Sequence, residues 1–192
     1  MTVRLVDVAM ASLDGYVEDA KGTFDWAAPD EEVHQFVNDL LRPIGTYLYG
    51  RRIYETMQVW ESEYGNASDP PVARDFARIW RAADKIVYST VLQQVPTSRT
   101  QLERSFDVDA IRELKSRAAH DLAIAGPGLA AHAFRAGLVD EIHLLLAPII
   151  VGGGKKALPD DVRLELELIE ERRFRASGVV YLHYRTRGSP RT

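Results

Sequence analysis

The chain has 192 residues, 46% hydrophobic and 27% charged, which is enough for one sizeable core and short for two domains. Its net charge of −4 provides no basic field to hold nucleic acid, so no nucleic-acid partner is expected. The absence of cysteine excludes disulfides, thiolate metal sites and cysteine nucleophiles. Without a signal-peptide pattern or a long uncharged apolar stretch, we expect a cytoplasmic protein with no membrane partner.

The first half of the sequence alternates apolar runs with amphipathic segments. Residues 3–11 predict a buried strand, the turn residues 12–15 end it, and 16–25 resemble a loop. Residues 29–32 open a helix, because proline and acids favour a first helical turn. The further predictions are strands over 44–49 and 85–89, helices beginning at 50–52 and covering 72–83, and a surface loop over 61–71.

The second half continues the alternation and then changes character. Asp107 is a plausible N-cap for a helix that reaches residue 118. The next predicted elements are a strand over 122–125, a glycine turn over 126–128, a helix over 129–136, and strands over 142–151, 162–168 and 179–184. We therefore predict an α/β fold with a largely parallel sheet and a C-terminal antiparallel hairpin. One domain is expected over residues 1–187, followed by a frayed tail at 188–192.

Four predicted strand ends carry residues that suit phosphate groups. In open α/β sheets ligands bind beyond the carboxyl ends of the strands, so these ends should share one rim. Arginines offer forked donors, and the N–H groups of a helix that starts at a glycine turn can cradle an anion. Two phosphate-binding clusters favour NADP over NAD. The strand ends are Ser12-Leu13-Asp14-Gly15, Gly50-Arg51-Arg52, Ser89-Thr90 and Gly126-Pro127-Gly128.

Each motif also has a purely structural interpretation. The turn at 126–128 lacks the Rossmann fingerprint and could simply join a strand to a helix. Arg51 and Arg52 could be solvated charges, although cations oppose the dipole at a helix start. The Ser89-Thr90 pair could be an ordinary strand end, and glycines 152–154 could form a flexible turn or a close backbone contact. Only the joint pattern favours a ligand.

Candidate carboxylates lie at Asp14 and in the acidic group that contains Glu31. Beside an aromatic pocket that includes Trp26, a carboxylate could bind the N–H edge of a pyrimidine or pteridine, or supply a proton. Alternatively, Asp14 makes a turn before a glycine, and the acids near Glu31 favour their helix dipole. The five histidines show no metal-ligand spacing, so no metal is expected, and His143 and His183 are interpreted as structural.

The sequence resembles the dihydrofolate-reductase-like superfamily, and more closely the C-terminal reductase domain of the bacterial bifunctional deaminase-reductases of riboflavin synthesis. The most family-specific element is the run 138–141, followed by the Pro148 strand and three glycines. The resemblance rests on VDVAMASLDGYV at 6–17, YLYGRRIYETM at 47–57, KIVYST at 85–90, LAIAGPGLAAHAFRAGLVDEIHLLLAPIIVGGG at 122–154, and the final hairpin.

This resemblance implies a three-layer α/β/α fold, a homodimer, and an NADPH-dependent reductase of the CH-OH or CH-NH donor class. It implies a ribosylamino-pyrimidine phosphate as substrate, with Asp14 and Glu141 near its pocket. The implied cofactor contacts are Gly50, Arg51, Arg52, Ser89 and Thr90 on the adenosine side, Gly126, Pro127, Gly128 and Leu129 at the pyrophosphate, and Ala9 and Val17 at the nicotinamide.

Some positions depart from the family pattern. Ile53 stands where the family often has threonine, and Pro127 replaces a frequent glycine and removes one backbone donor, so we expect altered rather than abolished cofactor binding. No deaminase half is present, so a stand-alone reductase is expected, with a substrate that has diverged. Trp26 with Pro29 and Glu31 resembles the folate-binding segment of dihydrofolate reductases. Three alternatives remain: a dihydrofolate reductase, a non-catalytic nucleotide-binding module, and an interaction protein.

Overall fold

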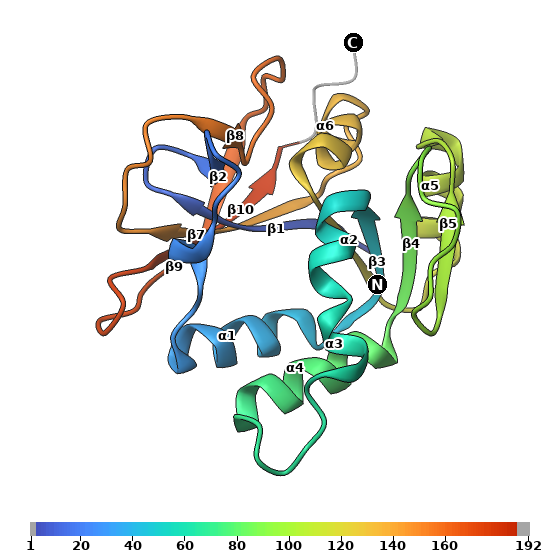
Figure 1. The fold of residues 1–192 in the computed structure, drawn as a ribbon. Coiled ribbons are helices and arrows are strands. Elements are labelled where there is room, and N and C mark those ends of the chain that lie inside the picture. Colours follow the sequence, from blue (N-terminus) through green and yellow to red (C-terminus); the bar gives the residue numbers. More distant parts are fainter. Residues whose placement is uncertain (1–2, 188–192) are drawn as a thin grey trace.

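The computed structural model describes residues 3–187, so the predicted frayed tail at 188–192 lies outside the described residues. Helical segments separate most of the strands as far as β7, and the last two strands, β9 and β10, form an antiparallel hairpin (Figure 1). The strands are β1 Leu5–Ser12, β2 Tyr16–Asp19, β3 Ile44–Gly50, β4 Asp84–Tyr88, β5 Thr100–Glu103, β6 Asp121–Ala125, β7 Glu141–Ala147, β8 Gly154–Lys156, β9 Leu166–Arg173 and β10 Val180–Thr186. The helices are η1 Asp25–Ala27, α1 Glu31–Leu41, α2 Arg51–Met57, α3 Val59–Ser62, α4 Pro71–Ala82, α5 Val108–Arg117 and α6 Pro127–Arg135.

The main sheet has the strand order β5-β4-β3-β6-β1-β7-β10-β9. Neighbouring strands from β5 to β7 are parallel, whereas β10 pairs antiparallel with both β7 and β9. The predicted α/β class, with a mostly parallel sheet and a C-terminal antiparallel pair, is confirmed. Because β4, β3, β6 and β1 are parallel neighbours, their carboxyl ends meet at the same edge of the sheet.

Helices cover both faces of the sheet and form two main apolar cores. On one face α1 and α4, which lie together in Figure 1, bury side chains such as Trp80 against β3 and β4. On the other face α5 and α6 bury Ile111, Leu129 and Phe134 against β1, β3 and β6. Helix starts follow their sequence signals: the side chain of Asp107 accepts hydrogen bonds from two backbone N–H groups at the start of α5. Within residues 3–187, none of the helices combines the length and apolar character that crossing a membrane requires.

The structure corrects several predicted elements. Residues 16–19, predicted as loop, form β2, whose partner β8 lies far along the sequence and was not predicted. A Cβ atom at Gly154 would lie 2.0 Å from the carbonyl oxygen of Glu18, so this glycine makes the close backbone contact rather than a flexible turn.

Other corrections concern strand limits. The strand predicted over 142–151 ends at Ala147, because Pro148 has no N–H for the sheet ladder. The strand predicted over 162–168 begins only at Leu166 and runs to Arg173. This β9 is an edge strand with mostly exposed side chains. The alternation of apolar and charged residues was therefore a poor guide to where the strand begins and ends. The short edge strand β5 was not predicted.

Candidate functional site

A cavity of about 490 Å³, here called the rim cavity, lies where β3, β4 and β6 end. Gly50 joins β3 to α2, Ser89 follows β4, and Gly126 joins β6 to α6. The structure therefore brings together the three glycine, arginine and hydroxyl motifs found in the sequence. The lining residues are Gly50, Arg51, Arg52, Ile53, Tyr88, Ser89, Thr90, Val91, Arg104, Ser105, Phe106, Gly126, Gly128, Leu129, His132 and Lys155.

A second cavity of about 260 Å³, the inner cavity, adjoins the first and shares Arg52, Ile53, Gly126 and Lys155 with it. It opens because β6 pairs with β1 only at residues 5–7, whereas β7 accompanies β1 over residues 6–12. Beyond this point the edge of β1 is free of β6. The lining residues are Asp7, Val8, Ala9, Met10, Val17, Glu18, Phe24, Ala27, Arg52, Ile53, Thr56, Ala125, Gly126, Pro127, Lys155 and Ala157.

Gly126 fixes the approach of α6 to α2 between these cavities. Its φ of 96° lies in the region that favours glycine, and a Cβ atom there would lie 3.2 Å from Cγ2 of Ile53. Pro127 occupies the first turn of α6. Proline has no backbone N–H, but an N–H in this turn has no carbonyl partner within the helix, so no helical hydrogen bond is lost. A Cβ atom at Gly128 would meet open space, so the backbone here is accessible to a ligand. The helix start thus presents its positive end to the rim cavity.

The charge of the rim cavity is opposite in sign to that of the whole chain. Its described lining contains four cationic side chains and no carboxylate, although the net charge of the chain is −4. Arg51 and Arg52 are substantially exposed and make only long ion pairs, at 3.3 Å to Glu55 and 3.4 Å to Glu18. Such weakly held guanidinium groups can turn toward a ligand. This cavity is suited to a molecule with several negative charges.

Ser89 and Thr90 lie on the loop after β4. The Oγ of Ser89 accepts hydrogen bonds from the N–H groups of Val91 and Leu92, at 3.2 and 3.1 Å, and so shapes this loop. Its hydroxyl proton remains available to donate to a ligand. Thr90 is exposed on the same loop.

Sequence reasoning missed four further residues of the rim cavity. Arg104 donates to the carbonyl oxygen of Ser89 at 3.0 Å, and Lys155 lines both cavities. The rings of Phe106 and His132 stack with centroids 5.9 Å apart, which provides an aromatic wall. Because β5 and β8 were not predicted, no sequence signal placed the adjacent residues 104–106 or 155 beside the glycine turn.

Asp7 is the residue of the inner cavity that sequence reasoning missed most clearly. It is 4% exposed, and its Oδ2 is buried without a hydrogen-bond partner among the described residues. Burial raises the pKa of this carboxyl to about 7. The sequence did contain a signal for Asp7, because it is an acid within a run of apolar residues that predicts a buried strand. Acids are rarely buried without a reason. A buried, unpartnered carboxyl at the wall of a cavity is typical of a functional group.

The carboxylate proposed at Asp14 lines neither cavity. It accepts hydrogen bonds from the N–H groups of Val151 and Gly152, at 3.1 and 2.8 Å, and these hold the β1–β2 turn to the loop after β7. Hydrogen bonds from the Ser12 side chain and from these N–H groups lower the pKa of Asp14. These bonds are those of a loop anchor, and the contact of Asp14 with a substrate stays a prediction.

The structure also places the other proposed substrate residues outside both cavities. Glu31 is exposed at the start of α1 and borders a separate hollow beside Arg172. Trp26 lies in η1, and its neighbours Phe24 and Ala27, rather than Trp26 itself, line the inner cavity. Glu141 is buried at the amino end of β7, the end remote from the rim. None of these three residues lines either cavity, and their proposed contact with a substrate stays a prediction.

Comparison with known proteins shows the same fold elsewhere. The chain is 27% identical over 186 residues to the uncharacterized protein YyaP of Bacillus subtilis. This alignment covers 96% of this chain and 95% of YyaP. It resembles a Shewanella sp. PV-4 protein assigned to riboflavin biosynthesis, with a TM-score of 0.74 and 20% identity over 96% of this chain and 99% of the other. It also resembles Enterococcus faecalis dihydrofolate reductase complexed with NADP(H), with a TM-score of 0.65 and 13% identity over 97% and 98% of the chains.

A match to a family model covers nearly the whole described chain. Residues 5–180, from the first residue of β1 to the first residue of β10, match the RibD C-terminal domain. The resemblance found in the sequence, to the reductase domain of the deaminase-reductases of riboflavin synthesis, is thereby confirmed. The chain belongs to the RibD C-terminal domain family.

Proposed function

We propose that the protein is an NADPH-dependent reductase that acts on a pyrimidine- or pteridine-like substrate. The observation that carries this proposal is the rim cavity, with its four cationic side chains and no carboxylate, adjoining an inner cavity that contains a buried acid. A dinucleotide with two phosphate groups and a further ribose phosphate matches the first cavity, and its reducing ring matches the second. Family membership supports the same activity.

The cofactor contacts follow from this division of the site. Arg51, Arg52, Ser89 and Thr90 would hold the phosphate on the adenosine ribose, because guanidinium and hydroxyl donors suit phosphate oxygens. The start of α6 would hold the pyrophosphate with its backbone N–H groups. Gly50, which joins β3 to α2, lines the same cavity and would border the cofactor there.

The inner cavity would align the nicotinamide with the substrate. Ala9 and Val17 line it beside Pro127, and an apolar wall excludes water from the reacting atoms. The bound cofactor supplies a hydride, and the protein holds the two rings in contact.

Asp7, which also lines the inner cavity, would meet the substrate there. With a pKa near 7, the carboxyl group exists in both protonation states at neutral pH. It can therefore accept an N–H of a heterocyclic ring or donate a proton during reduction. These properties support a homologue of 5-amino-6-(5-phosphoribosylamino)uracil reductase. Asp7 thus takes the role that sequence reasoning gave to Asp14 and Glu31.

A turnover assay tests this proposal. We expect NADPH absorbance to fall in the presence of protein and a ribosylamino-pyrimidine phosphate, with dihydrofolate as the competing substrate. The variant Asp7→Asn should lose turnover, whereas Glu63→Gln, which changes an exposed carboxyl after α3, should not. Binding of NADPH without oxidation by either substrate class would favour the non-catalytic module instead.

A further inference from the structure

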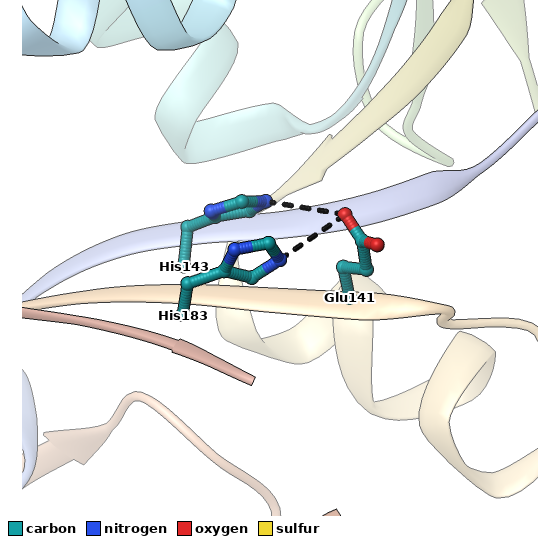
Figure 2. A group of neighbouring side chains, drawn as sticks. All are labelled: Glu141, His143 and His183. Carbon is teal, nitrogen blue, oxygen red and sulfur yellow. Dashed lines mark ion pairs between the residues drawn. The ribbon is translucent and has the colours of Figure 1, made fainter. Parts of the chain in front are cut away.

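Three potential metal ligands converge near the amino end of β7, where this strand pairs with the carboxyl half of β10. Glu141 and His143 are two residues apart on β7 and so point to the same face, and His183 lies directly opposite His143 on β10. Figure 2 shows both imidazole rings side by side, with one nitrogen of each directed at the same oxygen of Glu141. The distances from Oε2 of Glu141 are 3.2 Å to Nε2 of His183 and 3.9 Å to Nε2 of His143.

The cluster is buried and incompletely satisfied. The side chains of Glu141, His143 and His183 are 3%, 6% and 12% exposed. Nε2 of His183 has no hydrogen-bond partner among the described residues, despite its short distance to Glu141. A buried ring nitrogen without a hydrogen bond is costly, so another partner for it is expected.

A further contact orients one of the rings. Nδ1 of His143 lies 2.7 Å from the hydroxyl oxygen of Tyr181, the next inward-facing residue of β10. When Nδ1 carries the proton and donates it to this hydroxyl, Nε2 keeps its lone pair facing Glu141. Metal-binding histidines commonly have such an outer hydrogen bond, which fixes the ring and its tautomer.

We propose that Nε2 of His143, Nε2 of His183 and Oε2 of Glu141 form a binding site for a divalent transition metal of the zinc and cobalt class. Two imidazoles and one carboxylate are a donor set that suits these ions. The three ligand atoms lie within 4.8 Å of one another. Tetrahedral zinc requires ligand atoms about 3.3 Å apart, so a small closure of the His143 side chain completes the site. A water molecule would take the fourth position.

Two arginines contact Glu141, and one of them, Arg4, competes with the metal for Oε2. Nη1 of Arg4 donates to Oε2 of Glu141 at 2.9 Å, whereas Arg185 approaches the other oxygen, Oε1, at 3.5 Å. Arg4 is half exposed, and its Nε donates to Asp121 at 2.9 Å, so it can release Glu141 and stay paired. Arg185 can remain where it is. Removing the Arg4 charge should therefore strengthen metal binding.

Cobalt titration of the dialysed 192-residue protein tests the site. We expect visible absorption bands of four-coordinate Co²⁺ that saturate at one ion per chain and disappear when Zn²⁺ is added. His183→Ala should weaken binding at least tenfold, whereas His120→Ala, which removes an exposed histidine, should leave it unchanged. Arg4→Met should tighten binding several-fold. Circular dichroism would verify that each variant is folded.

Thermal unfolding provides an independent readout, since an ion that binds only the folded state raises the melting temperature. We expect Zn²⁺ to raise it for the wild type and for His120→Ala, and not for His183→Ala. The proposal is overturned if millimolar Co²⁺ produces no such bands, or if His183→Ala gives the wild-type spectrum and thermal shift. Neither outcome depends on NADPH, because the cluster lies at the opposite end of β7 from the rim.

Discussion

The buried carboxyl of Asp7 should make the folded protein less stable as the pH rises, and replacing Asp7 with asparagine should remove most of this effect. Burial raises its pKa from 3.8 to about 7 in the folded protein. Between these values the unfolded chain releases a proton that the folded protein keeps. Stability from this group is therefore fully present below about pH 4 and is lost as the pH rises to about 7. A difference of about three pKa units corresponds to about 4 kcal/mol.

Urea unfolding of both proteins at pH 4.5 and pH 8 measures this effect. The free energy of unfolding of Asp7→Asn, relative to that of the wild type, should be higher at pH 8 than at pH 4.5 by about 3 kcal/mol, because roughly 1 kcal/mol of the full effect is already lost at pH 4.5. Any cost of burying the amide itself cancels in this comparison. Glu63→Gln serves as the matched control and should show no such pH dependence. If the difference between Asp7→Asn and wild type is the same at both pH values, Asp7 is not a buried titrating group and the reasoning is refuted.

Three further predictions concern the site and the assembly. Asp7→Asn should lower kcat about 100-fold while the Kd for NADPH stays constant, because Asp7 faces the substrate rather than the phosphates. A rise in the Kd for NADPH as large as the fall in kcat would contradict this role. Gly126→Ala should cost about 1–3 kcal/mol in urea unfolding, whereas Gly128→Ala, whose Cβ meets open space, should not; equal stabilities would refute the strain at φ 96°. We also propose a homodimer through the edge strand β9, where Leu168 and Ile169 are 47% and 39% exposed. Sedimentation should give a dimer that Leu168→Asp dissociates, and a monomeric wild type at micromolar concentration would contradict this.

The rim of the site could be predicted from the sequence because its geometry follows from chain direction. Parallel strands end at one edge of a sheet, so the residues after three predicted strands had to lie near one another. Gly50, Ser89 and Gly126 are where this rule places them. The fourth strand end, residues 12–15, was expected on the same rim but lines neither cavity. Its Asp14 is hydrogen-bonded instead to the loop after β7.

The rest of the site depends on register and on pairs of distant segments, which spacing does not encode. Asp7 faces a cavity only because β6 stops pairing with β1 at that residue. The histidines His143 and His183 have no metal-ligand spacing in the sequence, yet the β7–β10 register makes them direct neighbours. For the same reason Glu141, assigned to the substrate pocket by resemblance, lies at the far end of its strand.

The affinity for NADPH compared with NADH, measured for the wild type and for the Arg51→Ala/Arg52→Ala double variant, tests the central claim most directly. If these guanidinium groups hold the ribose phosphate, the wild type should bind NADPH at least tenfold more tightly than NADH. The double variant should weaken NADPH binding by about 10- to 100-fold and leave NADH binding nearly unchanged. Equal affinities for the two dinucleotides in the wild type, or no NADPH binding at millimolar concentration, would contradict the proposed function.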